Sequence, residues 1–149
     1  MCRNWNNRST IKASTFRRMI QKSINNLSLI RISIFIILID QISKVWAANK
    51  LSQGFPSPFI PGLIQFHLTR NSGAAFSLLS NTGPLLGILS LIVSIALFLW
   101  ISKSSPLPIW HGLGFSFLLG GAFGNGLDRW RLGYVTDFLE FIPIDFPIF

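Results

Sequence analysis

Three long apolar stretches, separated by segments of different character, set the pattern of this chain. They cover residues 27–48, 84–101 and about 107–125. At about 1.5 Å per residue, a helix of roughly twenty residues crosses the apolar core of a bilayer, which is about 30 Å thick. The pattern predicts an α-helical integral membrane protein with three transmembrane helices.

The segment 49–83, between the first and second apolar stretches, has a different pattern. Prolines and glycines interrupt its short apolar runs, and Asn71-Ser72-Gly73 is a turn signal. This pattern favours short strands and turns over a helix. We therefore expect a small sheet that lies on the membrane surface.

The composition supports a membrane location. Half of the 149 residues are hydrophobic and only 12% are charged, whereas a soluble domain usually has about 25% charged residues. The mean hydropathy is +0.50. The single cysteine, Cys2, allows neither a disulfide framework nor a cysteine-based metal site.

The net charge of +8 is concentrated ahead of the first acidic residue, Asp40. Residues 1–26 are rich in Arg, Lys, Ser and Asn and contain no acid. Basic residues next to a membrane helix mark its cytoplasmic side, so this distribution favours a cytoplasmic tail over a surface that binds nucleic acid. We interpret residues 1–26 as a tail with little order, and a transit-type presequence remains an equal alternative.

The same charge rule predicts the topology of the rest of the chain. The loop at Lys103 lies with the N-terminus in the cytoplasm, so residues 49–83 and those after about 125 lie on the outer side. Ionisable groups near hydrocarbon are costly and usually mark function. The polar residues that this topology gathers at the outer face are Asp40, Lys44, Asn71, Asn125, Asp128, Arg129 and Asp137.

Two local patterns give more information about these polar residues. Asp40 and Lys44 are four residues apart and therefore share one face of a helix. The stretch Gly120–Glu140 holds three of the five acidic residues in the chain. We interpret Asp128 and Arg129 as a structural pair that ties loops together at the mouth of the helix bundle.

The chemistry that these residues permit is acid chemistry. His67 and His111 are expected on opposite sides of the membrane, which argues against a Ser–His–Asp site, and no spacing typical of a metal site is present. Two close carboxylates cannot both ionise easily, so one keeps a proton while the other accepts one from water. Asp137, in an apolar frame, is the natural first member of such a pair. From the residues alone, an acid hydrolase at the membrane face is favoured narrowly over a structural role.

Three motifs together resemble those of the lipoprotein signal peptidases, also called signal peptidase II. They are DQISK at 40–44, RNSGAAFSLL at 70–79 and GGAFGNGLDRWRLGYVTDF at 120–138. The resemblance implies a monomeric aspartic endopeptidase of the bacterial inner membrane, without a cofactor. It would remove signal peptides from prolipoproteins by cleaving just before the diacylglyceryl-modified cysteine of the lipobox. The implied fold has four transmembrane helices and a small extracytoplasmic β-cradle, which would be residues 49–83.

The resemblance also assigns roles to individual residues. Asp137 matches the first catalytic aspartate of the family, in the pattern G-x-V-x-D-F. No metal ligand is implied. The polar residues implied to support the site or to hold the substrate are Asp40, Lys44, Asn71, Asn125, Asp128 and Arg129.

One departure from the family pattern concerns the second catalytic aspartate. In the family it follows shortly, in a pattern like F-N-x-A-D that opens the fourth helix. This sequence stops at Phe149, where that pattern would begin, so we expect a C-terminus that is incomplete. Asp145 precedes the matching position and is a weak substitute. Three hypotheses follow: a lipoprotein signal peptidase, a homologue that binds signal peptides without cleaving them, and, less favoured, a small membrane transporter.

Overall fold

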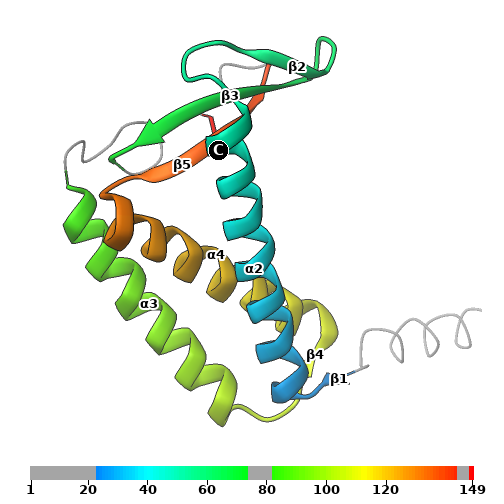
Figure 1. Cartoon of the computed structure of the whole chain (residues 1–149). Helices are drawn as coiled ribbons and strands as arrows, with labels where there is room; N and C mark the ends of the chain where they lie inside the picture. The colour runs from blue at the N-terminus through cyan, green and yellow to red at the C-terminus, as the bar shows by residue number, and fades with distance from the viewer. Residues whose placement is uncertain (1–22, 74–81, 144–147) are drawn as a thin grey trace, which may run out of the picture.

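The computed structural model describes residues 23–73, 82–143 and 148–149. Three long helices lie on one side of a three-stranded sheet, and a short two-stranded ladder lies at the opposite end of the helices (Figure 1). The helices are α2 (Asn26–Lys50), α3 (Gly83–Lys103) and α4 (Ile109–Leu132). The strands are β1 (Ser23–Ile24), β2 (Ser57–Ile60), β3 (Ile64–Asn71), β4 (Leu107–Pro108) and β5 (Val135–Phe141).

Local sequence signals explain where the helices begin and end. Asn25 caps α2, because its side-chain oxygen accepts a hydrogen bond from the amide of Ser28 at 2.8 Å. Pro84 lies in the first turn of α3, where a missing N–H costs nothing. Gly133 ends α4 in the left-handed region with φ of 82°, and its amide donates to the carbonyl of Arg129.

The helix bundle has a small apolar core around Leu29, Ile101 and Leu119, buries several polar residues and exposes many apolar ones. α4 packs against both α2 and α3. The outward surfaces of α2 and α3 expose large apolar side chains such as Phe35, Ile42, Ile88 and Ile92. Buried positions include Ser33 and Ser116, whose hydroxyls both donate to the carbonyl of Leu29. Such a surface suits lipid, since backbone and polar groups must be satisfied internally there.

Two of the three predicted membrane spans satisfy a length-and-composition test. Among the described helices, α2 and α3 are long and apolar enough to cross a membrane. The third, α4, is longer than expected: it continues seven residues past Asn125 and carries Asp128, Arg129 and Arg131 on its last turns. The predicted end at residue 125 is wrong, because the charged residues that follow it are still helical. The number of spans therefore stays a prediction.

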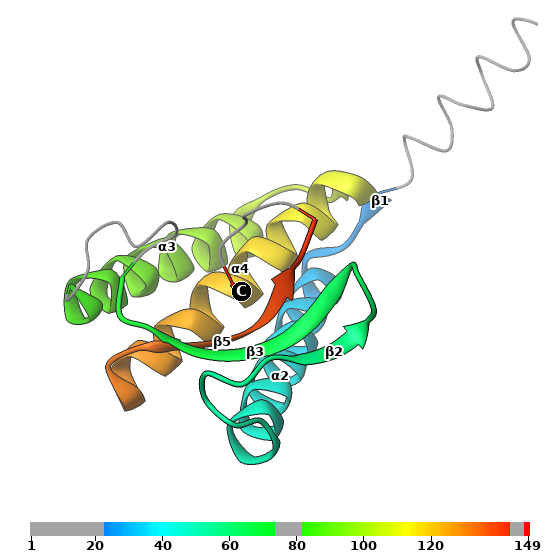
Figure 2. The same cartoon turned by 90° about the horizontal axis from the view of Figure 1, so that it is seen from above.

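The sheet differs from the expected one in its composition. β2 and β3 come from the expected segment 49–83, but β5 comes from the residues after α4 and completes an antiparallel sheet in the order β2-β3-β5 (Figure 2). The expectation that the whole sheet lies between the first two helices is wrong, because residues 135–141 form its third strand. The correction matters because β5 carries Asp137.

The predicted grouping of segments at the two ends of the bundle agrees with the structure. At one end β1 pairs with β4, and the side chain of Asn26 donates to the carbonyl of Ser104 at 2.7 Å. Residues 23–26, which we had included in a tail with little order, are therefore held in place. The rest of that predicted tail, residues 1–22, lies outside the described residues.

Candidate functional site

A buried lysine forms the centre of a polar network between α2, α4 and the sheet. The ammonium of Lys44 lies 3.0 Å from Asp40 Oδ2, 3.0 Å from Asp128 Oδ2 and 2.8 Å from Asn125 Oδ1. The predicted pairing of Asp40 with Lys44 on one helix face is confirmed by this geometry. The cation also bridges the two helices, because its other two partners lie on α4.

Asp128 connects this centre to the sheet. Its carboxylate is 3% exposed, and Oδ2 accepts from the backbone amide of Thr136 at 3.3 Å as well as from Lys44. Its other oxygen, Oδ1, accepts from the side chain of Gln41 at 3.1 Å. Because Thr136 precedes Asp137 on β5, Asp128 determines where that part of the strand lies.

Arg129 reaches the same region from the next position of α4. Its guanidinium donates from Nη2 to the carbonyl of Gly73 at 2.9 Å and from Nη1 to the carbonyl of Asn125 at 3.3 Å. The amide of Gly73 in turn donates to Asn71 Oδ1 at 3.0 Å. The side-chain amide of Asn71 therefore points its nitrogen at β5.

Asp137 on β5 accepts a hydrogen bond from that nitrogen. Asn71 Nδ2 donates to Asp137 Oδ2 at 3.0 Å, across the pairing of β3 with β5. Burial raises the pKa of Asp137 above its ordinary value of 3.8, while the Asn71 hydrogen bond and the charges of Lys44 and Arg129 partly oppose this rise. The carboxyl group therefore keeps its proton to a higher pH than an exposed aspartate does.

All seven site residues predicted from the sequence thus meet between the ends of α2 and α4 and the sheet. Asp128 and Arg129 lie on a helix, not in a loop, but they do tie other elements together. Within the described part of the chain, no second acidic side chain hydrogen-bonds to Asp137; Asp145 lies outside it. The same described residues contain no group of three His, Cys, Asp or Glu side chains that could hold a metal ion.

Two members of the network were missed by sequence reasoning. Gln41 Nε2 lies within hydrogen-bond distance of Asp40 Oδ2, Asp128 Oδ1 and the carbonyl of Gly124. The backbone amide of Thr136 is the other. A signal for Gln41 existed, since it lies beside Asp40 where the first apolar stretch turns polar. No side-chain pattern identifies a backbone donor.

Gly124 makes room for the network, and its substitution is a test of the packing. A Cβ atom at this position would collide with Asp40 Oδ2, whereas a Cβ at Gly121 on the same helix would meet nothing within 4 Å. We expect Gly124→Ala to lower the free energy of unfolding by about 1–3 kcal/mol, as overpacking does. Gly121→Ala is the matched control and should be neutral or slightly stabilising, because Ala favours helix over Gly. Thermal unfolding in detergent compares the two, and equal stabilities would contradict the packing argument.

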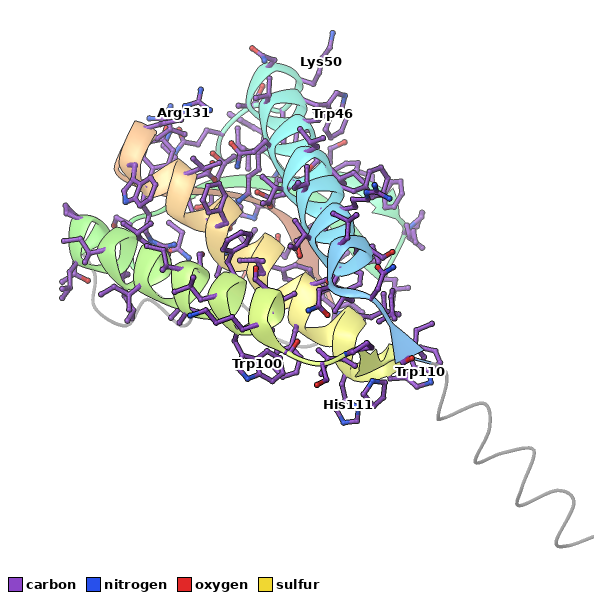
Figure 3. The ribbon with its side chains drawn as sticks, turned by 90° about the horizontal axis from the view of Figure 1, so that it is seen from below. Trp46, Lys50, Trp100, Trp110, His111 and Arg131 are labelled. Carbon is purple, nitrogen blue, oxygen red and sulfur yellow. The ribbon has the colours of Figure 1, made fainter. Side chains whose placement is uncertain are left out.

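Aromatic and charged side chains mark the two ends of the helix bundle. Figure 3 shows Trp100, Trp110 and His111 along the lower part of the view, where α3 ends and α4 begins, and Trp46, Lys50 and Arg131 along the upper part, where α2 and α4 end. Tryptophan and basic residues prefer the water–membrane interface. The polar network around Lys44 lies at the second end, near the sheet.

Comparisons with known proteins identify relatives of this chain. The family model described as signal peptidase (SPase) II matches residues 32–149. A lipoprotein signal peptidase of Parasynechococcus marenigrum (strain WH8102) is 48% identical over 76% of this chain and 72% of its own length. Another, from Synechococcus sp. (strain RCC307), is 44% identical over 76% of both chains.

Solved structures agree with the sequence comparisons. A structure described as a bacterial membrane enzyme superposes with a TM-score of 0.77 and 32% identity over 86% of this chain and 79% of that one. A second structure with the same description gives a TM-score of 0.74 at 32% identity, and the match covers 84% of that chain. The signal peptidase II model alone covers well over half of the sequence, and it includes every residue of the network around Lys44 and Asp137. This chain belongs to the signal peptidase II family.

Proposed function

We propose that this protein is an aspartic endopeptidase that removes signal peptides from diacylglyceryl-modified prolipoproteins, cleaving just before the lipid-modified cysteine. One observation carries the proposal: the carboxyl group of Asp137 is partly buried, hydrogen-bonded to Asn71 and close to the charges of Lys44 and Arg129, at one end of an apolar helix bundle. A carboxyl group whose pKa is raised in such a place is a candidate for acid–base catalysis.

The proposed reaction is hydrolysis and needs no cofactor. A water molecule loses a proton to an ionised carboxylate as its oxygen attacks the carbonyl carbon of the scissile peptide bond. A protonated carboxyl polarises that carbonyl, and the carbon–nitrogen bond then breaks as the departing amine takes a proton. Asp137 is one of the two carboxyl groups. The family resemblance implies that the other is a second aspartate, in a pattern like F-N-x-A-D.

The other residues of the site have supporting roles in this proposal. Lys44 places one positive charge between the buried Asp128 and the partly buried Asp40, so that neither carboxylate is left without a cation. Arg129 and Asn71 form a relay through Gly73 that orients Asp137. The side-chain oxygen of Asn125 accepts a hydrogen bond from Lys44. The polar side chains named in this paragraph are also the candidates for holding the backbone of the substrate.

The proposal includes a location and an orientation. The protein is a multi-pass protein of the bacterial inner membrane, it functions as a monomer, and its N-terminus is cytoplasmic. Its site lies at the extracytoplasmic face, where the sheet meets the ends of α2 and α4. Its partners are prolipoprotein signal peptides and membrane lipid, and nucleic acid is not among them.

The test is a cleavage assay in detergent or in vesicles. We expect the polypeptide of the complete reading frame to cleave a prolipoprotein that carries the diacylglyceryl group and to leave the unmodified precursor uncut. Mass spectrometry of the product locates the cut relative to the modified cysteine. An intact modified substrate, with Asp137 present and the protein folded, would overturn the proposal.

A second candidate function is the binding of signal peptides without hydrolysis. It is favoured by the absence, within the described part of the chain, of a second acidic side chain bonded to Asp137. The 149-residue chain itself tests this alternative. Retention of the modified substrate without turnover, measured by pull-down and by the cleavage assay on the same sample, supports binding alone. Turnover excludes it.

A further inference from the structure

The hairpin of β2 and β3 has an aromatic face that is in contact with α2. The ring of Phe66 on β3 lies 5.4 Å from the ring of Trp46 at the end of α2, centroid to centroid. On its other side Phe66 lies 4.9 Å from Phe59 on β2. The rings of Trp46, Phe66 and Phe59 therefore form a continuous row from the end of α2 to β2.

The outer part of this hairpin is apolar and exposed. Phe55 is 76% exposed and Phe59 is 58% exposed, and Ile60 and Leu63 are also exposed. No Asp, Glu, Lys or Arg occurs between Lys50 and Arg70. Exposed apolar side chains that gather on one hairpin in this way indicate an interaction surface.

The opposite face of the same hairpin is polar. Gln65 and His67 flank Phe66 in the strand, so their side chains point to the other side of the sheet. Both are held by Glu140 of β5, whose Oε2 lies 2.8 Å from Gln65 Nε2 and 2.7 Å from His67 Nδ1. The hydrogen bond from Gln65 lowers the pKa of Glu140, so this face carries a negative charge at neutral pH.

A sheet with one aromatic and one charged face fits a boundary between lipid and water. The aromatic face continues the exposed apolar surface of α2, where Ile42, Val45 and Trp46 face outward. Aromatic rings are favoured at the membrane interface, where an apolar body meets a polar surface. We propose that the hairpin from Phe55 to Leu63 inserts its aromatic face into the outer leaflet of the bilayer and anchors the sheet at a set depth over the site.

The occupant in this proposal is the phospholipid bilayer. Continuity with the lipid-facing surface of α2 argues for it, because the ring contacts run from Trp46 on the helix through Phe66 to Phe59 on the hairpin. The acyl chains of a bound substrate are the alternative, and the experiment separates the two. The proposal concerns the position of the hairpin and holds whether or not the protein cleaves prolipoproteins.

The test places a single environment-sensitive fluorophore on each face of the hairpin. Cys2→Ser removes the native thiol, and Phe55→Cys or Phe59→Cys then carries the label on the apolar face. His67→Cys labels the polar face and is the matched control. The full chain is reconstituted without substrate in nanodiscs of phosphatidylcholine and phosphatidylglycerol. One set of samples contains lipid with a nitroxide on the upper part of its acyl chain. A second set contains no nitroxide, and iodide is added to the water.

We expect lipid nitroxide to quench labels at 55 and 59 several-fold more strongly than the label at 67, and iodide to give the reverse order. Both apolar sites are used so that one poorly folded variant does not decide the outcome. Equal quenching at all three sites, or iodide quenching at 55 and 59, would overturn the proposal. Lipid quenching that appears only after a diacylated lipopeptide is added would also overturn it, because the surface would then belong to the substrate.

Discussion

Asp137→Asn should abolish prolipoprotein cleavage, with an expected loss of about 10²- to 10⁴-fold in rate, the range that a general acid–base group contributes. In the native protein Asn71 Nδ2 lies 3.0 Å from Asp137 Oδ2. The amide of the variant has the same shape as the carboxyl group, and its oxygen can still accept this hydrogen bond. It cannot take up or release a proton at the pH of the assay. The measurement is single-turnover cleavage of a diacylglyceryl-modified precursor by the polypeptide of the complete reading frame.

Glu140→Gln is the matched control for this prediction. Glu140 is another carboxylate on β5, but its partners are Gln65 and His67 and it contacts none of the residues around Lys44. We expect the control to cleave at the rate of the unmodified protein. Wild-type cleavage by Asp137→Asn would exclude Asp137 from the chemistry, and loss of cleavage in both variants would indicate damage to the sheet.

The pH profile of Asn71→Ala distinguishes a proton-transfer role from a structural one. The Asn71 hydrogen bond lowers the pKa of Asp137, so its removal raises that pKa further above the ordinary value of 3.8. The limb of the pH–rate profile that reports Asp137 should therefore move to higher pH in Asn71→Ala. A profile that only loses height, with its midpoints unchanged, would show that Asn71 supports the fold and does not tune the carboxyl group.

Lys44→Met should cause the largest loss of stability of any substitution at the site. The ammonium is buried and lies 3.0 Å from carboxylate oxygens of both Asp40 and Asp128. Methionine fills a similar volume but leaves the buried Asp128 and the partly buried Asp40 without this cation. Breaking a buried ion pair by removing one partner typically costs about 3–5 kcal/mol. The expected result is a corresponding fall in the free energy of unfolding, measured by denaturant titration in detergent.

Two further variants make this prediction specific. Lys50→Met removes an exposed lysine from the end of the same helix, and surface substitutions usually change stability by no more than about 0.5 kcal/mol. Adding Asp40→Asn to Lys44→Met should recover part of the loss, because one of the two unpaired charges is then removed. If Lys44→Met is as stable as Lys50→Met, the buried network does not hold α2 to α4.

The long apolar helices could be predicted because their signal is local. The apolar stretches 27–48 and 84–101 correspond to α2 and α3 within a few residues. The end of α4 was missed for the same reason, since the prediction followed hydropathy and the helix continues through Asp128 and Arg129 to a glycine stop at Gly133. These two charged side chains have partners on other elements: Asp128 contacts Lys44 and Gln41, and Arg129 donates to the carbonyl of Gly73.

The sheet was harder to predict because strand pairing is not local. β3 and β5 are separated along the chain by α3 and α4, and β5 gave no alternation that marked it as a strand. Its pairing with β3 nevertheless sets the distance between Asn71 and Asp137. The motifs that contain these two residues indicated the family, but they could not give the register that joins them.

The sequence by itself determined the apolar stretches, the shared helix face of Asp40 and Lys44, the end of the bundle at which the polar residues collect, and the family. These properties follow from helix periodicity, hydropathy and motifs, which act over a few neighbouring residues. The tertiary structure alone decided that Lys44 bridges Asp40 to Asp128, that Gln41 joins them, and that Asp137 lies on a strand beside Asn71. Those contacts join residues 66 to 87 positions apart, so they depend on how whole helices and strands pack, and no local pattern encodes that packing.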